Sequence, residues 1–425
     1  MKHTEVLERV YDPGRLWAAW QQVKHNAGAA GIDQMTVEEF EARQEELLEL
    51  IQEKLRAGIY RFKPARRALI PKGGSTSQKR KLGIPVVMDR VVAQSIHRVF
   101  EEIFDPEFTG ANFGFRRGKS QHQAIGYVQS MVREGYEWCA SIDMANFFDE
   151  IPHDLMVRLI RRRIADERLV TLIARALKAG VVVEGKFEKT SHGCPQGSPL
   201  SPILSNMVLN ELDQELERRG LKYCRWADDF VIVVRSERAA RRVMTGGIRY
   251  LEGELGLRVN REKSKVANIK EVTFLGFQIL RGKIRVSNKA SNRFKARVRA
   301  LTRRNNPLSM YEVIVKLNTY LRGWVEYFRI QEFRYLFRDL DGWIRSRLGS
   351  MQLKKWKKPR KFQRVMIKAG FMRQEARRIW VKMNKWQSVE RKEVRFDLNL
   401  QWFRRMGLLP LHDFTRATPG PRSGR

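Results

Sequence analysis

The sequence predicts an α+β protein that continues into a helical, strongly basic C-terminal part. Three observations lead to this prediction: strand-like runs alternate with helical periodicity up to about residue 280, long helices follow, and most of the net positive charge lies beyond that point. With 425 residues and 43% hydrophobic content, the chain is long enough for two or three packed domains and too apolar to be disordered.

The first 85 residues predict a helical layer followed by a hairpin. Apolar residues recur at helical spacing over 6–28 and 37–55, on either side of a Gly-Ile-Asp turn at 31–33. Residues 60–85 alternate short strand-like runs with a loop of Gly, Ser, Lys and Arg, which is typical of a β-hairpin. A hairpin that carries so many cations suits a triphosphate.

The middle of the chain predicts an α+β unit with acidic residues at strand ends. We expect helices at 89–104, 121–134, 153–179, 204–219 and 239–255, strands at 139–142, 222–226 and 230–234, a hairpin around 185, a loop at 193–199 and a strand pair through 274–277. Asp143 directly follows one of these strands, and Asp228 and Asp229 occupy a tight turn between two others.

The C-terminal third carries most of the net charge. The chain has 82 Lys and Arg against 47 Asp and Glu, a net charge of +35, and residues 281–425 hold 38 of these cations against 10 acids, which is +28. Such an excess indicates a polyanionic partner, and nucleic acid is the first candidate. Aromatic residues are spaced through 288–385, and those within 320–343 are assigned to the core of these helices rather than to a stacking platform for bases. The end after Thr415 is expected to be frayed.

Composition also excludes several classes of protein. The N-terminus lacks an apolar signal-peptide core, and no stretch approaches the ~18–20 apolar residues of a spanning helix, so we expect no membrane association and a cytoplasmic, bacterial-type protein. Cys139, Cys194 and Cys224 are scattered without CxxC spacing, which supports neither a disulfide framework nor a zinc finger.

The three aspartates have the chemistry of a magnesium site. Hard Mg²⁺ prefers oxygen ligands, and nucleotidyl transfer uses two such ions about 3.5–4 Å apart. Any one of Asp143, Asp228 and Asp229 alone is better explained as a polar turn or strand terminator. The strongly apolar strands that flank them favour a metal site instead, because three acids beside a hydrophobic core are unfavourable unless a cation neutralises them.

An ordered set of motifs resembles the reverse transcriptases of group II introns. The motifs are Gly31-Ile-Asp33, Leu82-Gly-Ile-Pro85, Phe113-Gly-Phe-Arg116, Ser141-Ile-Asp-Met-Ala-Asn-Phe-Phe-Asp149, Pro195-Gln-Gly-Ser-Pro-Leu-Ser-Pro202, Trp226-Ala-Asp-Asp229, Lys263-Ser264, Phe274-Leu-Gly-Phe277 and Gly323-Trp324 with Tyr327-Phe328. Each motif alone is weak and their joint order is specific. The resemblance covers about residues 6 to 385.

The resemblance implies a right-hand polymerase with fingers and palm, a helical thumb and a basic C-terminal region. The implied domains are a helical N-terminal extension (1–60), fingers and palm (61–280), a helical thumb or maturase domain (285–385) and a basic tail (386–425). No His-Asn-His or paired-Cys segment follows the thumb, so the DNA endonuclease of some relatives is expected to be absent.

The resemblance also implies roles for individual residues. Asp143, Asp228 and Asp229 would bind two Mg²⁺ ions, with Mn²⁺ as a substitute; Lys72, Arg80, Phe148, Gln196 and Lys263 would contact the dNTP; Arg116, Phe274 and Gly276 would contact template or primer. Phe147 is the alternative to Phe148 as the ring that excludes a ribose 2′-hydroxyl. A structural salt bridge is the alternative for Arg116, and an exposed surface lysine is the alternative for Lys263.

One departure from the family pattern stands next to the acids. Trp226 occupies the position where tyrosine usually precedes Ala-Asp-Asp, which keeps the aromatic bulk and loses a hydroxyl donor. We expect the metal chemistry to survive and primer positioning or fidelity to change slightly.

The function implied is RNA-directed DNA synthesis from dNTPs onto the 3′-hydroxyl of a DNA or RNA primer, together with binding of structured intron RNA for splicing and mobility. Two alternatives stay open: a non-catalytic RNA-binding splicing factor, and a domesticated reverse transcriptase in host defence or repair. The RNA recognised and the oligomeric state are not encoded in any motif.

Overall fold

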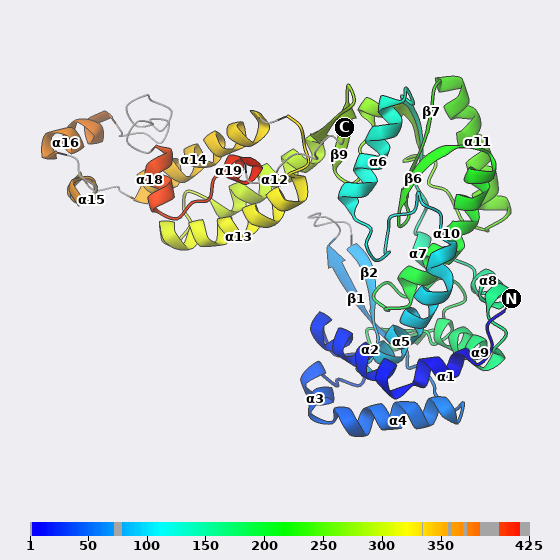
Figure 1. The fold of residues 1–425 in the computed structure, drawn as a ribbon. Coiled ribbons are helices and arrows are strands. Elements are labelled where there is room, and N and C mark those ends of the chain that lie inside the picture. The colour runs from blue at the N-terminus through cyan, green and yellow to red at the C-terminus, as the bar shows by residue number, and fades with distance from the viewer. Residues whose placement is uncertain are drawn as a thin grey trace. The chain divides into compact units, whose positions relative to one another are not determined.

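The computed structural model describes residues 2–71, 79–333, 335–355, 359–368, 372–382 and 399–416. The chain divides into two compact units, Met1–Phe274 and Leu275–Arg425 (Figure 1). Within these described ranges, no helix is both long enough and apolar enough to cross a membrane.

Four helices open the first unit: α1 (Val6–Tyr11), α2 (Pro13–Asn26), α3 (Val37–Ala42) and α4 (Gln44–Arg56). The helix predicted over 6–28 is two helices, because Pro13 begins α2 and the Asp12 side chain accepts a hydrogen bond from the amide of Arg15. Helices α1, α2 and α4 contact α5 (Val87–Phe104), so they form a layer at one end of the unit (Figure 1).

The first sheet of this unit has the strand order β2-β1-β4-β5. Strands β1 (Ala65–Pro71) and β2 (Lys79–Ile84) form the predicted antiparallel hairpin, and β4 (Val181–Val183) with β5 (Lys186–Glu188) forms the second predicted hairpin. Because β1 pairs in parallel with β4, the two hairpins share one sheet.

The second sheet is antiparallel and has the order β6-β7-β3-β8. Its strands are β3 (Trp138–Ile142), β6 (Lys222–Trp226), β7 (Asp229–Val234) and β8 (Lys265–Asn268). The helices α6 (Gln121–Arg133) and α11 (Glu237–Gly253) contact this sheet. Five of the six residues of β7 are buried, which matches the unbroken apolar run after Asp229.

The remaining helices of this unit connect the two sheets in sequence. They are α7 (Phe147–Glu150), α8 (His153–Arg163), α9 (Glu167–Leu177) and α10 (Ser201–Arg218), with short 3₁₀ turns at Asp105–Glu107 and Ile269–Glu271. The helix predicted over 153–179 is two helices, because the Asp166 side chain caps α9 and also accepts a hydrogen bond from the amide of Leu7.

The three cysteines lie in the interior. Cys139, Cys194 and Cys224 are all free and buried. Burial raises the pKa of the Cys139 and Cys194 thiols to about 12, so both are protonated at neutral pH.

The second unit begins with a two-stranded hairpin and continues as helices. Strands β9 (Phe277–Leu280) and β10 (Lys283–Val286) precede α12 (Asn288–Leu301), α13 (Met310–Phe328), α14 (Tyr335–Lys355), α15 (Pro359–Lys368) and α16 (Arg373–Lys382). An aromatic cluster forms its core: the rings of Phe294 and Trp324 are 4.2 Å apart, and Trp324 also contacts Phe328 and Phe337. The prediction of a core role is confirmed for Trp324, Phe328 and Phe337, whereas Tyr335 is 56% exposed.

Part of the predicted C-terminal tail is folded. Helix α19 (Leu411–Arg416) contacts α13 and α14, and Asn318 of α13 donates to the Gly407 carbonyl in the segment between α18 (Leu400–Arg405) and α19. Phe403 and Leu411 are fully buried. The Asp341 carboxylate on α14 accepts hydrogen bonds from the amides of Leu411 and His412 at 2.7 and 3.1 Å. The end after residue 416, expected to be frayed, lies outside the described residues.

Candidate active site

The sheet brings the three predicted aspartates to one end of neighbouring strands. Ile142 of β3 lies opposite Phe230 of β7 in the antiparallel pairing, so the adjoining residues Asp143 and Asp229 emerge side by side. Asp228 is the second residue of the two-residue turn, Ala227-Asp228, that joins β6 to β7, and Asp229 begins β7. The strand register therefore sets Asp143 beside Asp229, which is 86 positions away in sequence.

The charges of these carboxylates act on one another. Asp229 is exposed to solvent by surface area, but many protein atoms surround its carboxylate and partly desolvate it. This desolvation, followed by the charges of Asp228 and then Asp143, raises the pKa of Asp229 to about 7. A site of this kind favours a bound cation, which relieves the repulsion among the acids.

The donor set fits a hard divalent cation in its chemistry. All three candidate ligands are carboxylates, and oxygen ligands are what Mg²⁺ and similar ions require. Within the described ranges, no group of three or more Asp, Glu, His or Cys side chains stands ready-made to hold a metal ion. The three side chains thus share one end of the sheet without forming a closed ligand shell, as expected for like charges that repel one another.

The backbone of Asp143 is anchored by the segment that follows α11. The Asp143 amide donates to the Ser264 hydroxyl at 3.0 Å, and the Asp143 carbonyl accepts from the amide of Asn260 at 2.8 Å. Lys263 lies between these two residues in sequence, and it is exposed. The predicted dNTP-binding lysine therefore stands in the turn that holds one of the metal-binding candidates.

The two adjacent phenylalanines of α7 differ in burial. Phe147 is 3% exposed and belongs to the core, whereas Phe148 is partly exposed and packs edge-on against it with ring centroids 5.3 Å apart. The Phe148 carbonyl accepts a hydrogen bond from the amide of Cys194 at 2.8 Å. Of the two rings, Phe148 is the one with surface left for a ligand.

The loop that contains Gln196 is bonded to the hairpin β1–β2. The Gly83 amide donates to the Gln196 carbonyl at 2.8 Å, and a Cβ at Gly197 would lie 2.5 Å from the Gly83 carbonyl oxygen. Glycine is required at this close approach. Gln196 is partly exposed, so it keeps surface for contact with a ligand.

One of the two predicted triphosphate contacts falls on β2. Arg80 is exposed on β2, opposite Ile70 of β1. Lys72 lies outside the described residues.

Arg116 has the structural role that the sequence left as its alternative. Its side chain is 10% exposed, and all three guanidinium nitrogens are engaged: Nε donates to Asp105 at 2.6 Å, Nη1 to the carbonyls of Thr109 and Asn112, and Nη2 to Asp105. These contacts are those of the salt bridge that was the alternative for Arg116, and a contact with the template stays an untested prediction.

Phe274 and Gly276, which are predicted to contact template or primer, lie in sequence where the first unit ends and the second begins. Phe274 ends the first unit, and its ring is buried. Gly276 belongs to the second unit with a φ of +82°, and a Cβ there would lie 3.3 Å from the ring of Phe328. The Gly276 carbonyl accepts a hydrogen bond from Ser287 at 3.0 Å.

A buried polar network beneath the acidic turn is missing from the sequence-based prediction. Arg225 and Asp213 are both fully buried and paired at 2.5 Å, and Arg225 also contacts Asn206 and the carbonyl of Ala227. The one sequence signal is an arginine within the buried strand that leads to Ala-Asp-Asp. Nothing in the sequence around Asp213 on α10 indicates that it pairs with Arg225.

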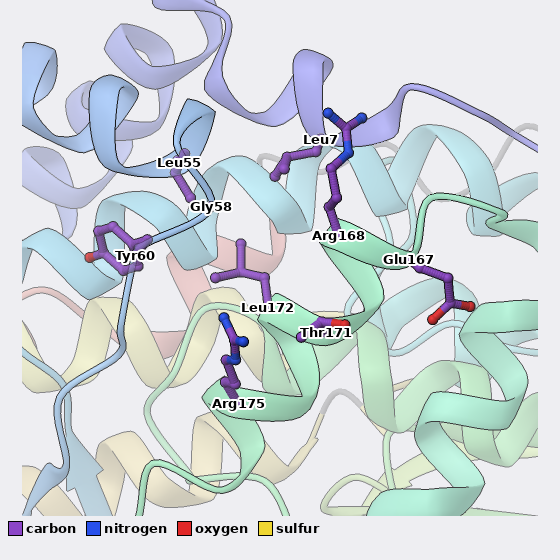
Figure 2. Close-up of a pocket in the computed structure, with 9 residues that line it drawn as sticks. All are labelled: Leu7, Leu55, Gly58, Tyr60, Glu167, Arg168, Thr171, Leu172 and Arg175. Atoms are coloured by element: carbon purple, nitrogen blue, oxygen red, sulfur yellow. The ribbon is translucent and has the colours of Figure 1, made fainter.

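A cavity elsewhere in the first unit contains none of the predicted site residues. It has a volume of about 340 Å³ and lies among α1, the end of α4 and α9. Figure 2 shows Arg168, Leu172 and Arg175 along its α9 side. Arg168 is engaged in ion pairs with Glu8 and Asp166.

Comparison with known proteins identifies the class. Residues 70–279 match the family described as reverse transcriptase (RNA-dependent DNA polymerase), and residues 291–370 match the group II intron, maturase-specific domain. The fold is that of a reverse transcriptase, and the protein is by class an RNA-directed DNA polymerase, a class that generally uses divalent metal ions.

Individual relatives narrow the class to a family. The chain is 33% identical over 298 residues to protein YkfC of Escherichia coli, covering 61% of this chain and 78% of YkfC. It is 34% identical over 229 residues to the group II intron-encoded protein LtrA of Lactococcus lactis subsp. cremoris, covering 52% of this chain and 37% of LtrA. The chain belongs to the group II intron reverse transcriptase and maturase family, whose members copy RNA and serve intron splicing and mobility.

Solved structures add little to this identification. A chain of a partial Cas6-RT-Cas1–Cas2 complex matches with a TM-score of 0.36 and 23% identity, covering 58% of this chain and 42% of that chain. Apo telomerase from Candida tropicalis matches with a TM-score of 0.43 and 13% identity, covering 53% of this chain and 55% of the telomerase chain.

Proposed function

We propose that Asp143, Asp228 and Asp229 hold two Mg²⁺ ions with which this protein extends a primer by dNTPs on an RNA template. One observation carries the proposal: the β3–β7 register sets Asp143 beside Asp229, at the turn that holds Asp228. The raised pKa of Asp229 supports it, because mutual repulsion of acids is the feature that a cation would relieve.

The ions would supply activation of the primer hydroxyl and neutralisation of charge on the triphosphate and leaving group. The residues of the chain do the rest: the carboxylates hold the ions, and fixed strands orient them. Mn²⁺ also accepts oxygen ligands, so it is expected to substitute for Mg²⁺.

The nucleotide would be held by residues around the acids. Phe148 offers a partly exposed ring that would lie against the sugar and exclude a 2′-hydroxyl. Gln196 sits in a loop whose backbone is fixed by Gly83, beside the hairpin that carries Arg80. The cations Arg80 and Lys263, together with Lys72, suit the charge of the triphosphate and pyrophosphate.

The second unit is proposed to be the thumb and to grip RNA. Helix α12 carries Lys289, Arg293, Lys295, Arg297 and Arg299 and no acidic residue, while Phe294 and Val298 are buried and Phe294 packs in the aromatic core. A helix with one buried face, whose charged side chains are all cations, suits phosphate contacts. In this proposal the same surface binds template RNA and structured intron RNA.

Two other functions make different predictions. A non-catalytic splicing factor would bind intron RNA without needing the three acids. A domesticated reverse transcriptase in host defence or repair would share the polymerase chemistry and differ in the RNA that it copies.

Primer extension on an RNA template tests the proposal. With Mg²⁺ we expect extension by dNTPs, little extension by NTPs and none with a chelator. Absence of extension, together with tight and salt-sensitive RNA binding, would contradict the polymerase function and favour the non-catalytic splicing factor.

The role of α12 is tested by the salt dependence of RNA binding. Arg293→Gln with Arg297→Gln should reduce the slope of log affinity against log salt by about 1.4, since each phosphate contact on single-stranded RNA contributes about 0.7. Arg238→Gln with Arg242→Gln, the same charge change at exposed sites on α11, should leave that slope unchanged. Equal slopes in both variants would remove α12 from the RNA-binding surface.

A further inference from the structure

The turn that carries Asp228 and Asp229 rests on a fully buried ion pair. Arg225, in the strand just before the turn, has no exposed side-chain surface, and neither does Asp213 on α10. Nε of Arg225 lies 2.9 Å from both Asp213 oxygens, and Nη2 donates to Oδ2 at 2.5 Å. The guanidinium is thereby held in a fixed orientation by a fork of charge-assisted hydrogen bonds.

The remaining guanidinium nitrogen reaches the turn itself. Nη1 of Arg225 donates to the Ala227 carbonyl at 3.0 Å and to Asn206 Oδ1 at 2.9 Å. The peptide group is planar, so fixing the carbonyl oxygen of Ala227 also fixes the amide nitrogen of Asp228. Ala227 has a φ of +56°, a left-handed conformation that is strained for alanine and needs such support.

The partners of Arg225 stand on one rigid element. Asn206 and Asp213 are seven residues apart, about two helical turns, and so they lie on the same face of α10. Asn206 also donates through Nδ2 to the Gly114 carbonyl at 2.8 Å. Gly114 approaches Ala227 so closely that a Cβ there would meet the turn's backbone. The network thus contacts the turn from two sides.

Stability alone does not explain this arrangement. A buried ion pair can often be replaced by apolar residues of similar volume without loss of stability, because the cost of desolvation offsets the attraction of the charges. The feature that apolar residues cannot reproduce is the donor fixed beneath the Ala227 carbonyl.

We propose that Arg225 is a positioning residue for the metal-binding turn: held by Asp213 and Asn206, its guanidinium fixes the Ala227–Asp228 peptide and so sets where the Asp228 and Asp229 carboxylates stand. The inference rests on the proposed two-metal function of these acids. It adds residues that touch neither metal nor nucleotide and that act through the backbone of the turn.

The first test separates positioning from folding. Arg225→Met with Asp213→Leu removes both charges and keeps an apolar core, so the double variant should melt within a few degrees of wild type. Its kcat for primer extension should fall about 10- to 100-fold, as expected for a displacement of up to about 1 Å in a catalytic group. The Mg²⁺ concentration for half-maximal rate should rise severalfold, and the KM for dNTP should change less than twofold.

Arg225→Lys supplies a second test that keeps the charge opposite Asp213. Lysine is a point charge and cannot reach Asp213, Asn206 and the Ala227 carbonyl at once, so the same loss of kcat and the same rise in Mg²⁺ requirement are expected. The matched control is Arg162→Met with Glu211→Leu, which removes an ion pair that also joins α10 but lies away from the turn. It should keep kcat within twofold of wild type.

The outcomes are distinct. A double variant or an Arg225→Lys variant that folds and keeps the wild-type kcat and Mg²⁺ dependence would overturn the proposal. Binding of Mn²⁺ to the complex with a chain-terminated primer, RNA template and dNTP, measured by electron paramagnetic resonance, gives a readout independent of turnover. Weakened Mn²⁺ binding in the variants supports positioning, and unchanged binding overturns it. An inactive wild type would instead contradict the proposed function.

Discussion

Replacing Gly114 with alanine is predicted to displace the acidic turn. A Cβ at residue 114 would lie 2.9 Å from the carbonyl carbon of Trp226, 3.1 Å from the Cα of Ala227 and closer still to the Ala227 nitrogen. Non-bonded heavy atoms pack favourably at about 3.5–4.0 Å, so the Ala227 nitrogen, which would lie 2.1 Å from that Cβ, must withdraw by roughly 1–2 Å. A shift of about 1 Å in a catalytic group already lowers kcat by about 100-fold.

The assay is primer extension at saturating dNTP, with RNA binding and thermal unfolding measured on the same samples. Gly110→Ala is the matched control, because it lies in the same segment, a Cβ there would have no atom of the described residues within 4 Å, and its φ is not positive. We expect Gly114→Ala to bind RNA normally and extend slowly, and Gly110→Ala to behave as wild type. A Gly114→Ala protein with the wild-type kcat would refute the reasoning, since the turn would then tolerate displacement.

Three further predictions concern other parts of the molecule. Phe148→Ala should lower the preference for dNTPs over NTPs at least tenfold in competition assays while its unfolding free energy stays at the wild-type value. Phe147→Ala should lose about 3–5 kcal/mol of unfolding free energy because its ring is buried. The opposite pattern in the two variants would exchange the roles of the two rings. Burial raises the pKa of Asp89 from 3.8 to about 7, so the native state binds a proton that the unfolded chain releases, and stability should fall by roughly 4 kcal/mol as pH rises from 4 to above 7. Asp89→Asn should lack this component in denaturant titrations at several pH values, and an unchanged pH profile would contradict it. Asp341→Ala removes the acceptor for the first amides of α19, so we expect a loss of about 0.5–2 kcal/mol and faster hydrogen exchange at Leu411; unchanged exchange would show that apolar contacts alone hold α19.

Local sequence patterns were sufficient to predict the strands of the second sheet and the acidic residues at their ends. The apolar run after Asp229 and the short strand before Asp143 predict buried strands, and the pairing of β3 with β7 confirms that both belong to one sheet. The hairpin around 60–85 was predictable for the same reason. The break before Pro13 was missed because helical periodicity continues across it, although proline at the first helical position was a readable signal.

Partnerships between distant residues were not predictable. Arg225 has the same side chain as the many surface arginines, and its burial depends on Asp213 on another element. Arg116 likewise looks like a surface cation in the sequence, whereas in the structure its guanidinium donates to Asp105 and to the carbonyl of Thr109. The docked helix α19 depends on Asp341, which is 70 residues away in sequence. No local propensity encodes such pairs.

The most direct test of the central claim is to compare Asp228→Ala with wild type in primer extension and RNA binding. Asp154→Ala, which removes an exposed acid on α8, is the matched control. The account predicts that Asp228→Ala abolishes DNA synthesis while RNA affinity and its salt dependence stay at the wild-type level, and that Asp154→Ala changes neither. DNA synthesis retained in Asp228→Ala would contradict the assignment of these aspartates as the metal site.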